Sequence, residues 1–365
     1  MAVHTRHPDL PPPDTTVGPV RWMRSNLFSS PFNTALTLLV FCLLYKVVPP
    51  LIDWAFIKAD WIGDSRNACT GGGACWVFIY VRFKQFIYGF YPEAERWRVN
   101  LAFGLLAITI IPLLIRRFPR KGWPAVFLVI VYPVISFYLF TGGRLGLKPV
   151  ETSLWGGLML TLIISAIGIA AALPIGIILA LGRRSAMPVV KSFSILFIEF
   201  WRGVPLITVL FMSSVMLPIF LPEGVNFDKL LRAMIGIVLF QSAYMAEVIR
   251  SGLQAIPKGQ FEAAESLGLG YWNSMALIIL PQALKHVIPG IVNTFIALLK
   301  DTTLVLIIGL FDLLAIIQAA YSDPDWLGYS AEGYTFAALI FWILCFAMSR
   351  YSQSLERKLH RGHSQ

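Results

Sequence analysis

Three pairs of opposite charges lie inside or beside long apolar runs: Glu199 with Arg202, Glu247 with Arg250, and Lys300 with Asp301. A charged side chain at the centre of a membrane helix costs about 2.5–3.5 kcal/mol on the insertion scale, so such residues normally face protein or water. Two interpretations stay open. The pairs set the register of packed helices, or some of them bind the ammonium and carboxylate of a zwitterionic amino acid or gate its passage.

Four uncharged polar residues are candidates for the same pathway: Thr161, Ser165, Gln241 and Tyr244. The first two belong to a face of small residues spaced by three or four, with Gly157, Gly168, Ala172, Gly176 and Ala180. Such a face predicts close packing against another helix, and its two hydroxyls could also line a polar path. The amide and the phenol could equally bond a neighbouring helix.

Signatures of catalysis are missing from the sequence. It contains no G-x-x-x-x-G-K-[ST], H-E-x-x-H or G-x-S-x-G, and His286 is far from the other histidines, which lie near the two ends. We therefore expect no catalytic residues, no metal site and no cofactor-binding site in this chain.

The composition is that of an integral membrane protein. Of 365 residues, 57% are apolar and 14% are charged, whereas soluble domains have about 45–50% and 25%. Helical spans need about 20 mostly apolar residues, and the short alternating strands of a membrane barrel are absent. The net charge of +10 is interpreted as a sign of membrane topology, with no nucleic-acid partner.

Apolar runs predict an all-α fold of about eight transmembrane helices, at 32–52, 99–115, 123–140, 152–181, 204–221, 230–248, 274–299 and 334–348. A further apolar run, 303–320, would place the basic C-terminal tail outside if it crossed. We therefore interpret it as a half-buried or re-entrant segment, in which Asp312 would be unfavourable facing lipid.

Lysine and arginine in the short loops predict the orientation, because cytoplasmic loops are enriched in both. The basic residues cluster after spans two, four and eight and in the N-terminal tail: Arg6, Arg21, Arg24, Arg116, Arg117, Arg120, Lys121, Arg183, Arg184, Lys191, Arg350, Arg357, Lys358 and Arg361. With eight spans, all of these lie on one side. Both termini are therefore predicted to be cytoplasmic.

The predicted external loop 53–98 contains Cys69 and Cys75 on either side of a glycine-rich turn. In an oxidising periplasm these two thiols should form a disulfide, since the five residues between them let the chain reverse. Cys42 and Cys345 lie within spans and are expected to be buried apolar thiols.

The segment between spans six and seven predicts a short amphipathic helix on a loop. Pro257 suits a helix start, and Glu262 and Glu265 are expected in its early turns. Ala263, Ala264 and Leu267 supply a small apolar surface, and Gly268 and Gly270 end it. Such a surface suits a linker, or docking onto another protein.

This segment resembles the EAA signature of permease subunits of ABC importers. The matching residues are Glu262-Ala263-Ala264, then Gly268, Ile278 and Leu280-Pro281. The flanking FWRGVPLITVLFM (200–212), YMAEVIRSGLQAIPKGQ (244–260) and LLKDTTLVLIIGLFDLL (298–314) look like the polar amino-acid branch of that family. The long form, with residues 73–101, resembles permeases of general L-amino-acid uptake systems.

The resemblance implies a type-1 importer core of five helices preceded by three extra ones. It divides the chain into a disordered cytoplasmic tail at 1–31, a three-span extension at 32–150, a transmembrane domain at 151–352 with the EAA loop at 250–281, and a basic cytoplasmic tail at 353–365. Glu262, Ala263, Ala264, Leu267, Gly268 and Pro281 would form the ATPase-coupling element. Gly268 stands out because a glycine there can take a positive φ that a side chain would oppose.

The partners implied are an ABC ATPase dimer that holds ATP and Mg²⁺, a second and shorter permease, a periplasmic amino-acid-binding protein and membrane lipid. The expected location is the bacterial inner membrane. A stand-alone secondary transporter is the alternative, but it would need an ion-coupling site and usually two matching halves, and no internal repeat is evident. A membrane scaffold would leave the charges within the spans without a purpose.

Overall fold

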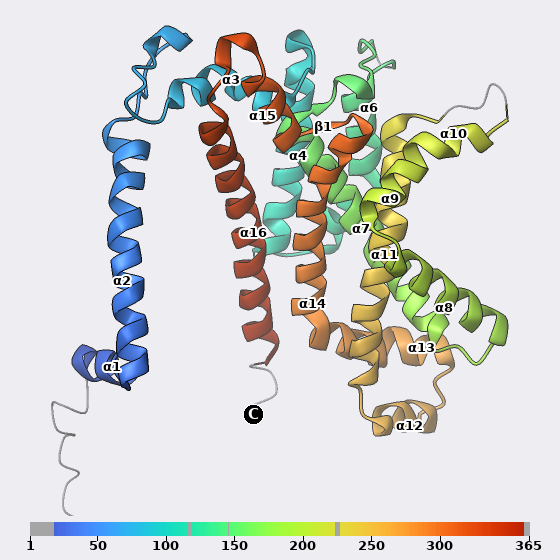
Figure 1. Ribbon diagram of the computed structural model, residues 1–365. Helices are drawn as coiled ribbons and strands as arrows, with labels where there is room; N and C mark the ends of the chain where they lie inside the picture. The colour runs from blue at the N-terminus through green and yellow to red at the C-terminus, as the bar shows by residue number, and fades with distance from the viewer. Residues whose placement is uncertain (1–17, 116–117, 145, 223–226, 361–365) are drawn as a thin grey trace, which may run out of the picture. The chain divides into compact units, whose positions relative to one another are not determined.

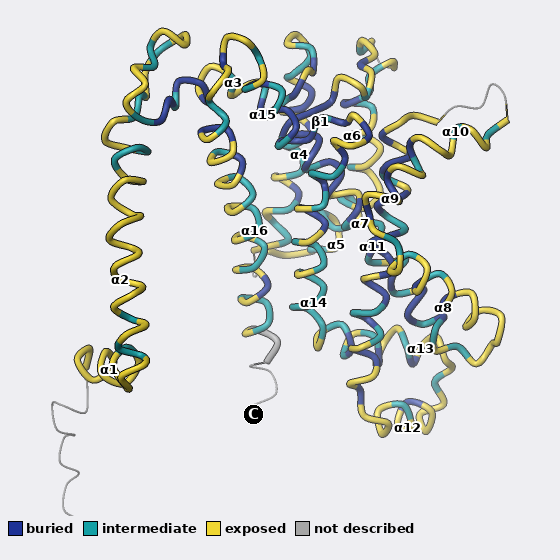
Figure 2. Tube along the Cα trace, viewed as in Figure 1, coloured by how far each residue is buried: buried dark blue, intermediate teal, exposed yellow. Residues whose placement is uncertain are grey.

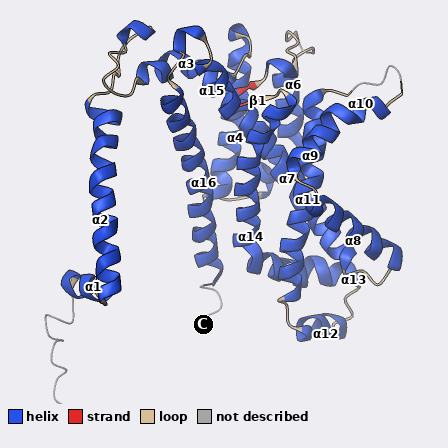
Figure 3. Cartoon of the chain, viewed as in Figure 1, coloured by secondary structure: helices blue, strands red, loops and turns tan. Residues whose placement is uncertain are grey.

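The computed structural model describes residues 18–115, 118–144, 146–222 and 227–360. Most of these residues are helical (Figure 3). The predicted roles of Arg6, Arg116, Arg117 and Arg361 in topology fall outside the described residues, as does most of the predicted N-terminal tail. By internal contacts the chain divides into two compact units, residues 1–77 and 78–365.

The first unit contains α1 (Pro19–Asn26) and α2 (Pro31–Ile52), and α3 (Trp76–Tyr88) begins at its end. Although 1–31 is predicted to be disordered, Pro19 occupies the first turn of α1, where proline is well tolerated. The side chains of Ser25 and Asn26 donate to the Trp22 carbonyl near the end of this helix. A helix therefore precedes the first apolar span.

The remaining elements belong to the second unit (Figure 1). They are α4 (Arg96–Leu114), α5 (Gly122–Val126), α6 (Tyr132–Thr141), α7 (Gly157–Arg183), α8 (Pro188–Gly203), α9 (Leu206–Phe211), α10 (Leu217–Phe220), α11 (Lys229–Gln254), α12 (Lys258–Ser266), α13 (Tyr271–Ser274), α14 (Leu280–Asp301), the strand β1 (Phe311–Asp312), α15 (Leu313–Tyr321) and α16 (Ser330–His360).

The predicted number of spans is confirmed. Within the described residues, seven helical segments are long and apolar enough to cross a membrane, and the bent pair 188–203 and 206–220 makes an eighth. Each of the eight apolar runs predicted from the sequence falls on one of these segments. The last helix extends to His360, well beyond the predicted end at 348, so the basic tail predicted from 353 begins as helix.

The fifth span differs most from its prediction. Instead of a straight helix over 204–221, the structure has α8, a bend of 101° and then a second helical segment that begins at Leu206. Pro205 explains the break, because proline has no N–H to donate and restricts the residue before it to extended backbone. Val204 is accordingly extended. Helix α8 was missed because its polar residues interrupt the apolar pattern.

Helix α7 packs its small-residue face against α11 and α14, as the spacing predicts. All seven members of that face, from Gly157 to Ala180, are buried. A Cβ built on Gly176 would lie 2.7 Å from Met245 Cγ of α11, and one on Gly168 would lie 2.7 Å from Leu298 Cδ2 of α14. Figure 2 shows buried residues along α7 and α11 and around β1 and α15. The two helices form the centre of the unit.

The apolar run 303–320 does not form a continuous helix. Residues 302–308 make a 3₁₀ helix, Gly309 turns the chain, and β1 and α15 follow. The backbone of 311–312 forms parallel bridges to 156–157 at the start of α7. Asp312 is fully buried, and its Oδ1 accepts a hydrogen bond from the Ala315 N–H at 3.0 Å. It faces protein, as expected for a carboxylate in an apolar run.

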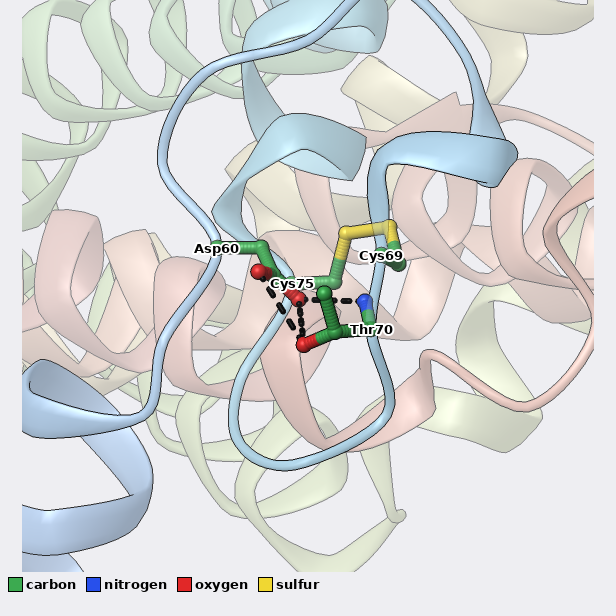
Figure 4. The surroundings of a disulfide bond; sticks show 4 residues. All are labelled: Asp60, Cys69, Thr70 and Cys75. Atoms are coloured by element: carbon green, nitrogen blue, oxygen red, sulfur yellow. Dashed lines mark hydrogen bonds between the residues drawn. A yellow bond between two sulfur atoms is a disulfide. The ribbon is translucent and has the colours of Figure 1, made fainter.

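The structure joins Cys69 and Cys75 in a disulfide, the pair expected from the sequence (Figure 4). The carboxylate of Asp60 accepts hydrogen bonds from the Thr70 N–H at 2.6 Å and from the Thr70 hydroxyl at 2.9 Å. The Asp60 backbone also pairs with both neighbours of Cys75, at Ala74 and Trp76. The glycine-rich turn is therefore closed by backbone, side-chain and covalent links.

Because α7 and α11 approach so closely at Gly176, we predict that Gly176→Val destabilises the protein by about 1–3 kcal/mol through overpacking. Its Cβ would also lie 3.1 Å from the Ala246 backbone nitrogen, which cannot move aside easily. Gly104→Val, on α4, is the matched control, because nothing lies within 4 Å of a Cβ there. Thermal unfolding in detergent should show a lower melting temperature for the first variant only. Equal melting temperatures would contradict the packing.

Candidate functional site

Helix α12 lies beyond the end of α11, at the opposite end of the second unit from β1 and α15 (Figure 1). Pro257 immediately precedes its first residue, and Leu267 follows its last. Gly268 has a φ of +71°, and the Gly268 and Leu269 N–H groups donate to the Glu265 and Ala264 carbonyls at 2.9 and 3.2 Å. This is a Schellman end, in which the glycine takes the left-handed conformation.

The expected placement of Glu262 and Glu265 in the early turns of α12 is wrong for Glu265. The helix starts at Lys258 and has nine residues, so its first turn contains no acid and Glu265 lies in its last turn. The helix dipole therefore does not explain why glutamates occur at positions 262 and 265. Both are exposed, so they are available to contact another protein.

The six residues predicted to couple to an ATPase divide into two groups. Glu262, Ala263, Leu267, Gly268 and Pro281 are exposed, and 74% of Leu267 is accessible. Ala264 is fully buried, so it supports the helix from inside and presents nothing to a partner. Gln260 accepts a hydrogen bond at 3.1 Å from Gln282 of α14, which anchors the same side. The exposed side of α12 is a small, part-apolar surface.

Glu247 is the centre of a charge cluster formed by Arg183, Glu199, Arg202, Glu247 and Arg250. Its carboxylate lies 2.6 Å from Arg183, 2.7 Å from Arg250 and 3.9 Å from Arg202. Arg183 also pairs with Glu199 at 2.9 Å. The side chain of Glu247 is only 16% exposed, and the cluster connects the end of α7 with α8 and α11.

Two of the three charge pairs expected from the sequence do not form in the described chain. Glu199 pairs with Arg183, and Arg202 approaches Glu247 instead of Glu199. Lys300 and Asp301 form no salt bridge, because adjacent helix residues point in different directions. Glu247 and Arg250 do pair, at the i,i+3 spacing that brings side chains together.

The uncharged path candidates have structural partners. The Thr161 hydroxyl accepts from the Leu313 N–H at 3.0 Å and donates to the Gly157 carbonyl at 3.2 Å. Ser165 donates to the Thr161 carbonyl at 2.7 Å. Gln241 donates to the Thr294 carbonyl of α14 at 2.7 Å, so it bonds a neighbouring helix.

Tyr244 differs from the other three because 38% of it is exposed. Its ring lies 4.9 Å from that of Phe240, and the Arg202 guanidinium lies over it at 5.7 Å. This arginine connects Tyr244 to the charge cluster. Of the four uncharged candidates, Tyr244 alone combines exposure with a contact to that cluster.

Arg183 is the member of the cluster that the sequence did not suggest. It was counted with the basic residues of a short loop, whereas the structure places it at the end of α7 between two glutamates. Its position was a usable signal: it continues the buried face of α7, three residues after Ala180. A charge at the end of such a face needs a partner on the helix packed against it.

The sequence matches a protein family described as "Binding-protein-dependent transport system inner membrane component" over residues 172–361. The chain is 58% identical to the inner membrane amino-acid ABC transporter permease protein YhdY of Escherichia coli (strain K12), with 98% of both chains covered. It is 42% identical to the glutamate/glutamine/aspartate/asparagine transport system permease protein BztC of Rhodobacter capsulatus, covering 97% of this chain and 96% of that one. A solved structure of an amino acid ABC transporter with histidines is 31% identical, with a TM-score of 0.49, and covers 55% of this chain and 92% of that one.

If an ATPase docks on α12, Gly268→Val should weaken its association, because valine in the left-handed region costs about 1–2 kcal/mol and would change the helix end. Gly270→Val is the matched control: both sites are open, but Gly270 has a φ of −63°. Both variants should reach the membrane. Pull-down from native membranes should recover less ATPase with Gly268→Val only, and equal recovery would exclude this docking geometry.

Removing the carboxylate of Glu247 should leave three arginines without their shared partner. We predict that Glu247→Ala destabilises the protein by about 2–3 kcal/mol, somewhat less than for a fully buried pair because the side chain keeps some exposure. The exposed Glu265→Ala is the control. Thermal unfolding of the two purified variants compares them, and equal melting temperatures would show that the cluster contributes no stability.

Proposed function

The chain belongs to the family of binding-protein-dependent transport system inner membrane components, and from this premise we propose that it forms the translocation path for L-amino acids in an ATP-driven importer. Family membership makes it a membrane permease and not a catalytic enzyme. The relatives are permeases of ABC transporters, which favours an importer subunit over the stand-alone secondary transporter.

The observation that carries the proposal is the exposed helix α12, placed at the end of the helix bundle and closed by Gly268 in the left-handed conformation. Its outer residues, Glu262, Ala263 and Leu267, are exposed without being needed for internal packing. A separate ATPase dimer docks on this surface and holds the ATP and Mg²⁺. Closure of that dimer moves α12 and, with it, the helices that surround the path.

The family description names binding-protein-dependent transport, which supports the other proposed partners. A periplasmic binding protein delivers the amino acid, and a second, shorter permease completes the pair. The chain lies in the inner membrane among lipids, with both termini cytoplasmic, so α12 is on the cytoplasmic side. The relative from Rhodobacter capsulatus is named for glutamate, glutamine, aspartate and asparagine, which favours polar substrates for this chain.

We propose that the charge cluster and Tyr244 line the cytoplasmic part of the path and bind the amino acid or gate its passage. Three arginines and two glutamates give the cluster one excess positive charge, and 54% of the Glu199 side chain and 36% of the Arg202 side chain are exposed. A zwitterionic solute presents both an ammonium and a carboxylate, and exposed charges of both signs can pair with it. Thr161, Ser165 and Gln241 then stabilise the helices through their hydrogen bonds and do not contact the solute. Lys300 and Asp301 remain candidates for the path.

The assembly purified from native membranes tests the function. Reconstituted with ATP on the side of α12 and with the binding protein plus labelled glutamine or glutamate on the other, it should accumulate the label. Uptake should stop when ATP is omitted or replaced by a non-hydrolysable analogue. Uptake that continues without ATP, driven by an ion gradient, would contradict the proposal and favour a secondary transporter.

A further inference from the structure

Two consecutive arginines at the end of α7 reach in different directions. Arg183, the last residue of the helix, pairs with Glu199 and Glu247 at 2.9 and 2.6 Å. Arg184 donates from Nη1 to the Leu253 carbonyl at 2.8 Å, and its guanidinium lies over the Phe261 ring at 5.4 Å. One helix end therefore contacts both the charge cluster and α12.

The partners of Arg184 are well placed for transmitting movement. Leu253 lies in the last turn of α11, where the final carbonyls lack partners within the helix and attract a cation. Phe261 is on the inner side of α12, packed against the buried cluster that contains Ile256, Ile279 and Ala283. Arg184 thus joins the ends of α7 and α11 to the inner side of α12 through a directed hydrogen bond and a ring contact.

Arg183, the neighbour of Arg184, belongs to the charge cluster. Arg183 is adjacent to Arg184 in the backbone, so a displacement of Arg184 acts on the Arg183 pairs with Glu199 on α8 and Glu247 on α11. Helix α7 cannot slide independently of α11, because their small-residue contact leaves no free space at Gly176. A displacement of α12 would therefore act on the charge cluster through Arg184 and Arg183.

We propose that Arg184 is a positioning residue that couples movement of α12 to the charge cluster through Arg183. The inference rests on the proposed function, because it takes α12 as the docking helix. The contacts of Arg184 are with the Leu253 carbonyl and the Phe261 ring, and not with the exposed residues proposed for ATPase docking. Its loss should leave docking intact and separate ATP hydrolysis from transport.

The test uses the whole assembly purified from native membranes, reconstituted with its binding protein and an equimolar mixture of labelled L-amino acids. For Arg184→Ala we expect the amount of amino acid moved per ATP hydrolysed to fall by about fivefold or more, the lower range of typical coupling. ATPase recovered by pull-down should stay within about twofold of wild type. Lysine keeps a cation that can donate to the Leu253 carbonyl and lie over the ring, so Arg184→Lys should restore part of the ratio. Lys191→Ala, an exposed cation on α8, is the control.

Two results would overturn the inference. An unchanged ratio of transport to hydrolysis in Arg184→Ala would show that the link carries no coupling. A parallel loss of ATPase recovery and transport at constant ratio would show a merely structural role. If Arg184→Ala does not reach the membrane, Phe261→Leu removes the ring contact while keeping an apolar side chain against the buried cluster, and it must also lower the ratio. A wild-type assembly that moves no labelled amino acid would instead contradict the proposed function.

Discussion

The arrangement of the helices around α7 depends on one constraint: a carboxylate taken largely out of water must be compensated by opposite charge. Glu247 meets this constraint with three arginines, from α7, from α8 and from its own helix. A single side chain therefore fixes how three helices meet. The cluster keeps one net positive charge, and two of its members, Glu199 and Arg202, are exposed, which is why we propose that it acts on a zwitterionic solute.

Close packing connects the charge cluster at one end of α7 with the β1 junction at the other end. The small residues of α7 bring its backbone against α11 and α14 between the β1 junction and the cluster. At one end of α7 the chain bridges to residues 311–312, and at the other end two arginines face the cluster and α12. In the proposed coupling, movement of α12 reaches the membrane helices through Arg184 and Arg183, whose contacts are either packed or charged.

Features that follow from local spacing were predictable from the sequence. The eight apolar runs, the buried face of α7 and the positive φ of Gly268 each depend on residues close together in the chain. Partners of charged residues were not predictable in this way: Glu199 selects Arg183, sixteen residues away, over Arg202, because the choice depends on how α8 packs on α7. The bend before Leu206 had a local signal in Pro205, but the polar residues of α8 obscured the helix before it.

The central claim is that this chain works only as the membrane part of a larger assembly, to which α12 connects it. The most direct measurement is purification from native membranes with a tag at the C-terminus, followed by identification of the proteins that accompany it. The account predicts an ABC ATPase and a second permease carrying the same EAA helix. A chain that reproducibly purifies alone and still moves amino acids into vesicles without ATP would contradict it.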